Sequence, residues 1–274
     1  MTTATAEDFR FLQQFILERS AIVLADEKQY LVETRLLPVV QRVGAESIGD
    51  LVRAIRHGDR ELETAVVDAM TTNETSWFRD AAPFEALRKV VLPDAIAANV
   101  VRRRLSIWSA ACSTGQELYS VTMLLDAEFS EVASWKLDLH GTDLSTSVVD
   151  KARSGRFTAL EINRGLPASH LVRYFRHEGS YYVIADSLRD KVRFELFNLA
   201  KPWPPMQDYD VILLRNVLIY FDVATKTKVL EQARAHLRAG GYLVLGTAES
   251  PRGLVEGFQS VPAAGTTVYK KEGS

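Results

Sequence analysis

The sequence contains a single cysteine, Cys112, among its 274 residues. One thiol excludes a framework of disulfides and a zinc site made of several thiolates. The five histidines are scattered along the chain and show none of the short spacings of a metal-binding motif. We therefore expect a chain without a bound metal, and cysteine usage of this kind is typical of cytoplasmic proteins.

The sequence also lacks a marked excess of charge and any long apolar run. Its 33 Lys and Arg residues nearly balance 35 Asp and Glu residues, which gives a net charge of -2. Domains that bind nucleic acid are usually strongly basic, so we expect no nucleic-acid partner. The apolar runs are far shorter than the ~18 residues that a membrane-spanning helix requires, and the first residues do not resemble a signal peptide. These absences predict a cytoplasmic protein that does not insert into membranes.

The first part of the chain, residues 1–72, has the pattern of a small all-helical domain. Apolar residues recur at helical spacing, as at Phe11 and Phe15. A second helix contains Pro38, which we expect to kink or divide it, and Gly44 is placed to end it. Residues that can cap the N-terminus of a helix stand before the later apolar stretches: Asp26, Ser47 and Asp59.

The remainder of the chain, residues 73–274, alternates short apolar strands with helices. This alternation predicts an α/β domain with a doubly wound, mostly parallel sheet that helices cover on both faces. We expect one helix to begin at Ser145 and end at Gly155, and another to run from Asp222 to the glycines at 240 and 241. The predicted strands are Leu105–Ala110, Leu137–Thr142, Val192–Leu199, Val211–Leu214, Tyr242–Leu245 and Thr267–Lys270.

Residues 157–193 break this alternation with short, aromatic-rich pieces. The residues His177–Ser180 have the composition of a hairpin turn. This segment therefore predicts a small antiparallel β insertion within the sheet domain.

Polar residues follow three of the predicted strands directly. The stretch "AACSTGQELYS" (110–120) joins a strand to a helix through small residues, so a ligand can approach its backbone closely. Gly115 is the one glycine there, and the G-x-G-x-x-G motif of dinucleotide-binding proteins is missing. A turn that binds no ligand remains an equal alternative for this loop.

Asp143 ends the second predicted strand, and Arg215 with Asn216 follows the strand Val211–Leu214. A carboxylate at the end of the second strand of a nucleotide-binding sheet can accept hydrogen bonds from both ribose hydroxyls; a helix cap is the alternative. Tyr220 comes next, with core packing as the alternative to a role in a site. Because parallel sheets bind ligands at the carboxyl ends of their strands, we predict the site there.

Six stretches of the sequence follow the order of motifs in one known family. They are "MTTNETSWFRD" (70–80), "SAACSTGQELYS" (109–120), "HGTDLSTSVVDKARSGRF" (140–157), "FNLAKPWP" (197–204), "YDVILLRNVLIYFD" (209–222) and "LRAGGYLVLGTAES" (237–250). Together they resemble the CheR family of chemotaxis receptor methyltransferases, from about residue 10 to the end. Three residues depart from the usual pattern: Gln116 stands where the family commonly has Glu, Leu118 where it has Pro, and Trp77 where it has Phe.

The resemblance implies an S-adenosylmethionine-dependent protein-glutamate O-methyltransferase with a class I methyltransferase-like fold. The cofactor would leave as S-adenosylhomocysteine. In the family, the stretch 70–80 lies at the junction of the two domains and covers the cofactor. The cofactor-binding residues that the resemblance implies are Asn73, Thr75, Arg79, Gly115, Glu117, Asp143, Asn198, Leu199, Arg215 and Asn216.

Arg79 and Tyr220 are the candidate catalytic residues. A free glutamate has a pKa of about 4.3, so the substrate carboxylate is ionised at neutral pH and needs no general base. What remains is alignment of the reacting groups, for which Arg79 offers a forked pair of donors and Tyr220 a hydroxyl. An inter-domain ion pair for Arg79 and core packing for Tyr220 are the structural alternatives.

Lys28, Arg35 and Arg42 are the candidate receptor-binding residues. They are seven residues apart, so an unbroken helix would place them on one stripe. In the family, a basic face of this domain meets the acidic cytoplasmic helices of methyl-accepting chemotaxis receptors. Six acidic residues within 26–60 make a merely solvated face an equal alternative.

Two other functions fit parts of the sequence. A nicotinamide-dependent oxidoreductase would share the doubly wound sheet, but the G-x-G-x-x-G motif is missing. A non-catalytic, cofactor-sensing signalling adaptor would share the family's motifs, but Arg79, Asp143 and Tyr220 are all present. We expect a monomer. Some family members add a peptide tethered to the receptor as a strand on the insertion; the short segment between Phe175 and Leu188 predicts that this chain does not need it.

Overall fold

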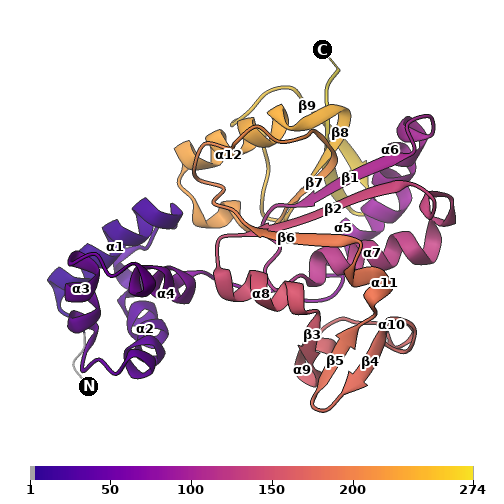
Figure 1. Cartoon of the computed structure of the whole chain (residues 1–274). Helices are drawn as coiled ribbons and strands as arrows, with labels where there is room; N and C mark the ends of the chain where they lie inside the picture. The colour runs from indigo at the N-terminus through magenta and orange to yellow at the C-terminus, as the bar shows by residue number, and fades with distance from the viewer. Residues whose placement is uncertain (1–3, 274) are drawn as a thin grey trace. The chain divides into compact units, whose positions relative to one another are not determined.

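The computed structural model describes residues 4–273, which form two compact units. The first unit comprises the chain up to Thr72 together with Tyr220–Thr225. The second unit comprises Asn73–Ile219 and the chain from Lys226 onward. Residues 1–3 of the predicted helical domain lie outside the described residues. Figure 1 shows the helices of the first unit and the sheet of the second.

The first unit is helical, as predicted. Its core is formed by apolar residues from all four α-helices, including Leu12, Val32, Leu51 and Val66. Two of the expected capping residues begin helices, since Ser47 accepts a hydrogen bond from the N–H of Asp50 and Asp59 accepts one from the N–H of Leu62. The elements are α1 (Ala6–Ser20), the 3₁₀ turn η1 (Asp26–Lys28), α2 (Gln29–Val43), α3 (Ile48–Arg56) and α4 (Arg60–Met70). Asp26 does not cap α2, which corrects the prediction: it is the first residue of η1, and the residue before α2 is Lys28, whose side chain makes no capping hydrogen bond.

Helix α2 differs from the prediction at Pro38. The helix runs from Gln29 to Val43 and ends at Gly44, which has a left-handed backbone, so Pro38 does not divide it. Pro38 is exposed, and water can hydrogen-bond the carbonyl that lacks an N–H partner on that side of a helix. Lys28 lies in η1, one residue before α2 begins.

The second unit is built on a seven-stranded sheet in the order β6-β2-β1-β7-β8-β10-β9. The first five strands of this order are parallel and the last two pair antiparallel. The predicted mostly parallel, doubly wound sheet is therefore confirmed. The strands are β1 (Arg104–Ser109), β2 (Lys136–Asp143), β6 (Val192–Leu196), β7 (Tyr209–Leu214), β8 (Leu237–Leu245), β9 (Phe258–Ala263) and β10 (Thr266–Lys271).

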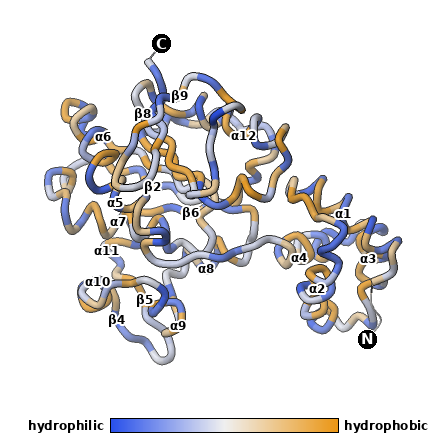
Figure 2. Tube along the Cα trace, turned by 180° about the vertical axis from the view of Figure 1, so that it is seen from behind, coloured by the Kyte–Doolittle hydropathy of each residue, from blue (hydrophilic) through white to orange (hydrophobic). Residues whose placement is uncertain are grey.

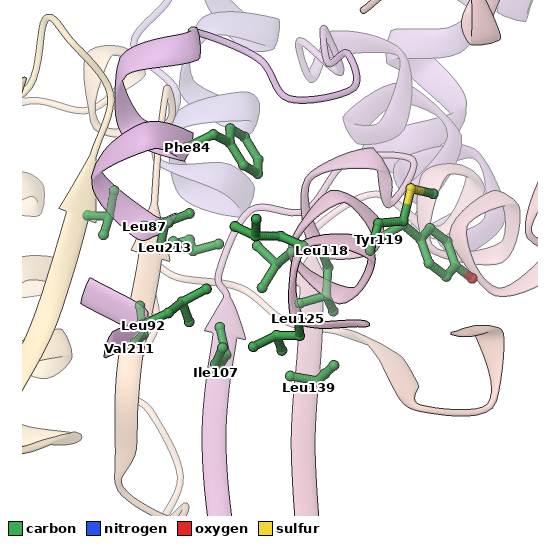
Figure 3. Close-up of a cluster of buried hydrophobic side chains, with 14 of the residues drawn as sticks. Phe84, Leu87, Leu92, Ile107, Leu118, Tyr119, Leu125, Leu139, Val211 and Leu213 are labelled. Carbon is green, nitrogen blue, oxygen red and sulfur yellow. The ribbon is translucent and has the colours of Figure 1, made fainter. Parts of the chain in front are cut away.

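Helices cover both faces of the sheet. Figure 1 shows α12 on one side and α7 with α8 on the other. On the second side, Phe84 and Leu118 pack over strand residues such as Ile107 (Figure 3). Helices α5 (Ala81–Ala86) and α6 (Leu92–Asn99) contain hydrophobic stretches, as the colouring of Figure 2 shows. The helices are α5 (Ala81–Ala86), the π-helical turn η2 (Leu87–Val91), α6 (Leu92–Asn99), α7 (Gln116–Glu128), the 3₁₀ turn η3 (Ser130–Val132), α8 (Thr146–Ser154) and α12 (Val223–Ala235).

The glycines at 240 and 241 do not end a helix, which corrects the prediction. Helix α12 ends at Ala235, and both glycines lie within β8. Gly240 has a φ of +73°, and a Cβ on Gly241 would lie 3.0 Å from the carbonyl oxygen of Asp210. The β7–β8 ladder is irregular at this point, between Tyr209 and Val211. The glycine pair therefore marks a bulge where two backbones approach closely.

The predicted antiparallel insertion is confirmed. It holds a three-stranded sheet in the order β3-β5-β4, and residues 179 and 180 form the short turn between β4 and β5. Its elements are β3 (Arg156–Thr158), α9 (Ala159–Ile162), α10 (Ala168–Tyr174), β4 (Phe175–Glu178), β5 (Tyr181–Ile184) and α11 (Asp186–Arg189).

Trp77 attaches the segment 73–80 to this insertion. Its side chain is 1% exposed and makes edge contacts with the rings of Phe157 and Phe175, at centroid distances of 4.8 and 5.4 Å. The indole N–H donates to the carbonyl oxygen of Glu161 and the backbone N–H to that of Arg164, both at 3.0 Å. We call residues 73–80 the strap, and the insertion fixes its middle.

We expect Gly165→Ala to detach the strap from the insertion. A Cβ at this position would lie 2.3 Å from the carbonyl oxygen of Trp77, and the φ of +96° is strained for alanine. We expect the variant to lose about 3 kcal/mol or more of unfolding free energy in denaturant titration. Gly179→Ala is the control, because its φ of +59° is also positive but nothing lies within 4 Å. Equal losses in the two variants would contradict the strap contact.

His140 is a buried histidine on β2. It is 2% exposed; its Nδ1 lies 2.7 Å from the Tyr209 hydroxyl and its Nε2 lies 3.0 Å from a Glu195 carboxylate oxygen. Burial, helped by the charge of Arg193, lowers the pKa of His140 from its usual 6.5 to about 4. The neutral ring satisfies both contacts by accepting from Tyr209 and donating to Glu195.

This pKa predicts a pH-dependent stability. The unfolded chain binds a proton at His140 below pH 6.5 and the folded chain only near pH 4, so the free energy of unfolding falls as pH decreases through that window. The loss from this residue should reach about 3 kcal/mol. His140→Gln should remove that component from denaturant titrations at pH 4.5 and 7, whereas His177→Gln, at an exposed position, should keep it. An unchanged pH slope in His140→Gln would refute the assignment.

Candidate functional site

The carboxyl ends of four neighbouring strands, β2, β1, β7 and β8, carry the polar loops of the second unit. Strand β2, which follows β1 in the chain, pairs with one edge of β1, and β7 pairs with the opposite edge. Such a reversal of strand order opens a crevice at the carboxyl ends, where ligands of α/β sheets bind. The loops after these strands therefore meet at one edge of the sheet.

The loop after β1 is held by groups from two other parts of the unit. Ser113 has a left-handed backbone with φ +49°. Its N–H donates to Oδ2 of Asp143 at 2.9 Å, and its hydroxyl donates to the carbonyl oxygen of Asn73 at 2.8 Å. Gly115, the residue before α7, has φ +91°, and a Cβ there would lie 3.0 Å from the Cβ of Ala152. The loop thus connects the strap with the end of β2, and Gly115 is needed for close packing.

Asp143 and the loop after β6 lie together. The second carboxylate oxygen of Asp143 accepts from the N–H of Ser145 at 3.1 Å, and its carbonyl oxygen accepts from the N–H of Phe197 at 2.8 Å. Asn198 follows, with its side-chain oxygen accepting from the N–H of Ala200 at 3.0 Å. Leu199 is buried beside it. The loop that carries Asn198 and Leu199 therefore begins beside Asp143, and their binding of a cofactor stays a prediction.

The strap carries Arg79 between two strained residues. Phe78 has φ +48° and Asp80 has φ +57°, both unusual for residues with a side chain. The N–H of Phe78 donates to the Ser120 hydroxyl at 3.1 Å, and a guanidinium N–H of Arg79 donates to the carbonyl oxygen of Glu74. Asn73, Thr75 and Arg79 are all half-buried. Backbone strain held in place by hydrogen bonds is a frequent mark of a functional segment.

Arg215 ties the strap to the sheet. Its side chain is 2% exposed, and Nη1 donates to Oε2 of Glu117 at 2.7 Å. Its Nη2 donates to the carbonyl oxygen of Arg79 at 2.7 Å and to Oδ2 of Asp80 at 3.0 Å. The other oxygen of Glu117 accepts from the Ser109 hydroxyl at 2.8 Å. The Nε of Arg215 is buried and is without a hydrogen-bond partner among residues 4–273.

Glu249 is a site residue that the sequence analysis missed. It lies beyond the end of β8, and its carboxylate accepts hydrogen bonds from the loop after β7, which contains Asn216. The one available signal was its place in the stretch "LGTAES", four residues after an apolar strand. Asn216 itself has a left-handed backbone with φ +58°.

Tyr220 groups with the helical unit. Its carbonyl oxygen accepts a hydrogen bond from the N–H of Val23 at 3.0 Å. The predicted cofactor-binding residues, Arg79 among them, all belong to the second unit. The catalytic role of Tyr220 stays a prediction.

Cys112 and the carboxylates at the strand ends support neither a thiolate nor a metal ion. Burial raises the pKa of the Cys112 thiol well above its usual range, and the charges of Asp143 and Glu117 act in the same direction. The thiol is therefore protonated at neutral pH and is a poor nucleophile. Within the described range 4–273, no three His, Cys, Asp or Glu side chains are grouped to hold a metal ion. In the same range, no helix combines the length and apolar character needed to cross a membrane.

Comparison with known proteins gives the family. Residues 73–266 match the model of the CheR methyltransferase SAM-binding domain, and residues 7–71 match the CheR all-alpha domain. The chain is 40% identical over 275 residues to chemotaxis protein methyltransferase 1 of Pseudomonas aeruginosa, covering 98% of this chain and 99% of that protein.

Two further relatives show the same pattern. The chain is 40% identical over 272 residues to the chemotaxis protein methyltransferase of Vibrio anguillarum, covering 98% of each. It is 35% identical to that of Salmonella typhimurium, covering 95% of this chain and 88% of that protein. These matches exclude the alternative of a nicotinamide-dependent oxidoreductase. The chain belongs to the CheR methyltransferase family.

Proposed function

We propose that this chain transfers a methyl group from S-adenosylmethionine to glutamate side chains of chemotaxis receptors, forming methyl esters. The observation that carries the proposal is the convergence of Asp143, Glu117, Arg215 and the strap at the carboxyl ends of β2, β1 and β7. These groups lie within residues 73–266, which match a SAM-binding domain. Relatives that span the whole chain carry the name chemotaxis protein methyltransferase.

The groups at this edge fit the cofactor. S-adenosylmethionine has a ribose, an adenine and an amino-acid tail but no pyrophosphate, so it needs a carboxylate for the ribose and polar loops rather than a three-glycine motif. Asp143 supplies the carboxylate, and the small-residue loop at 110–115 lets a ligand approach the backbone. The unpartnered Nε of Arg215 leaves one buried donor in the same network. Asn73, Thr75, Asn198, Leu199 and Asn216 complete the proposed pocket.

The reaction requires orientation more than acid–base catalysis. When bound, S-adenosylmethionine supplies the methyl group on a positively charged sulfur. The substrate carboxylate is ionised at neutral pH, since a free glutamate has a pKa of about 4.3. One N–H of Arg79 is bonded to Glu74 among residues 4–273, so its remaining donors are available to hold that carboxylate. Alignment of this kind can lower a barrier by about 7–11 kcal/mol in favourable cases.

Receptor contact is proposed for the helical unit. Arg35 and Arg42 lie on the unbroken helix α2, and Lys28 lies just before it. Lys28 and Arg42 are exposed. Arg35 is engaged within the unit, because it donates to the carbonyl oxygens of Met70 and Thr71 and to the Thr72 hydroxyl. We therefore propose Lys28 and Arg42 as receptor contacts, with Arg35 also stabilising the end of α4.

We further propose that a tethered receptor peptide is not required. Strand β5 (Tyr181–Ile184) is paired with β3 on one edge and with β4 on the other. An added strand would therefore have to pair with the outer edge of β3 or β4, each of which has four residues or fewer. The two-residue turn at 179–180 is too short to offer backbone N–H and C=O groups for pairing with a peptide.

Arg79→Ala tests the proposed activity. We expect the variant to lose most base-labile methyl transfer from labelled S-adenosylmethionine to a receptor cytoplasmic fragment, at least about tenfold in kcat, because the carboxylate loses its orienting donors. Arg164→Ala is the matched control, since Arg164 pairs with Glu74 on the same strap but lies on the insertion. Near-normal methylation by Arg79→Ala with saturating cofactor would exclude the orienting role. No labelling by the unaltered protein would reject the proposed function.

Asp143→Ala should weaken binding of S-adenosylhomocysteine by about 1–3 kcal/mol, the range for hydrogen bonds to a charged group. Isothermal titration calorimetry measures this directly. The control is Asp150→Ala, which removes an exposed carboxylate of α8 instead. If both variants bind S-adenosylhomocysteine as tightly as the unaltered protein, Asp143 has only a structural role in holding the loops at Ser113 and Ser145.

A further inference from the structure

Glu249 has a carboxylate whose hydrogen bonds all come from backbone groups. Its Oε2 accepts from the N–H of Asn216 and of Gly246, both at 2.8 Å. Its Oε1 accepts from Val217 at 2.9 Å and from Leu218 at 2.7 Å. The residue is 9% exposed, and no arginine, lysine or histidine lies within ion-pair distance of it among residues 4–273. Four N–H dipoles therefore offset the buried negative charge.

The turn from Gly246 to Glu249 packs closely against the loop after β7. The N–H of Glu249 donates to the carbonyl oxygen of Gly246 at 3.0 Å, which closes a tight turn and returns the side chain to the end of β8. A Cβ on Gly246 would lie 2.7 Å from both Glu249 Oε2 and Asn216 Oδ1. Gly246 is therefore the residue that allows the β8 loop to approach the β7 loop.

The segment that donates hydrogen bonds to Glu249 directly follows β7. Three successive N–H groups, from 216 to 218, point to one carboxylate, and Asn216 has φ +58°. A left-handed residue followed by converging N–H groups forms a concave nest that favours an anion. Without the anion, three N–H groups at a partly buried turn would have to find water or rearrange. The backbone of this segment thus depends on the charge of Glu249.

We propose that Glu249 is a positioning residue for the methyl transfer: its ionised carboxylate fixes the backbone 216–218 and thereby presents Asn216 to the cofactor. This rests on the proposed function, in which Asn216 is a cofactor-binding residue. Glu249 itself acts through the loop and does not touch the cofactor. Glutamine in its place has one oxygen, and its NH₂ group faces two N–H donors, so the loop cannot keep its conformation.

The test is a double-mutant cycle on the dissociation constant of S-adenosylhomocysteine. Glu249→Gln should raise this constant about tenfold or more, the scale of a lost charge-assisted hydrogen bond. Glu256→Gln, at an exposed acid without such contacts, is the control and should leave the constant within about twofold. Asn216→Gly removes the partner side chain while keeping a residue suited to positive φ.

If Glu249 acts through Asn216, Glu249→Gln added to Asn216→Gly should raise the dissociation constant less than about twofold further. If the two substitutions instead multiply each other's effect on the dissociation constant, the proposal is overturned and Glu249 has only a general stabilising role. An unchanged constant in Glu249→Gln would overturn it as well. The amide signals of residues 216–218 in NMR spectra of the cofactor-free protein should shift in Glu249→Gln and stay in place in Glu256→Gln.

The same measurements separate this inference from the proposed function. If Asn216→Gly binds S-adenosylhomocysteine normally, the cofactor role of Asn216 fails. If Glu249→Gln then still weakens binding, Glu249 does not act through that side chain, and the inference fails with it. Activity gives a further readout: loss of positioning should raise the KM for S-adenosylmethionine more than it lowers kcat at saturation, whereas partial unfolding lowers kcat alone.

Discussion

The buried guanidinium of Arg215 is the interaction on which the site's architecture depends. It joins three pieces of chain: the end of β7, the first turn of α7 through Glu117, and the strap through Arg79 and Asp80. A charge with 2% side-chain exposure is tolerated because two carboxylates and a carbonyl surround it. Loss of one partner would leave a charge buried without compensation. The strap therefore has one position relative to the strand ends, and the same ion pairs define it.

Backbone strain and a hydrogen bond that holds it occur together at three positions along this edge of the sheet. Phe78, Ser113 and Asn216 all have positive φ, and each donates its backbone N–H to a side-chain oxygen from a different segment. Each such conformation costs on the order of 1 kcal/mol or more. The acceptors, which are two carboxylates and a hydroxyl, offset this cost locally. The loops are thus held in their conformation by the protein's own groups before any ligand is bound, which reduces the entropy lost on binding.

Sequence reasoning succeeded where one short segment determines the structure. Apolar runs followed by polar residues located the strand ends, and capping side chains located the helix starts. It failed where distant backbone decides. The glycines at 240 and 241 have the composition of a helix end but serve a bulge beside Asp210. The expected division of α2 at Pro38 failed for a local reason, since an exposed proline leaves its helix continuous where water can reach the free carbonyl. The strand Phe258–Ala263 contains Pro262 and polar residues, which hid it. The role of Glu249 follows from contacts made 31 to 33 residues away.

The attachment of Trp77 has a consequence for how the chain folds during synthesis. The indole donates to Glu161, 84 residues further along the chain. The strap is made early, yet its anchor emerges from the ribosome only after β1, α7 and β2 have been translated. Until then Trp77, with Phe78 beside it, is an exposed aromatic pair on an unattached segment. Contacts of such long range form late in folding because closing long loops costs entropy. Exposed aromatic surface at that stage favours aggregation and binding by chaperones, so the nascent chain is vulnerable in this interval.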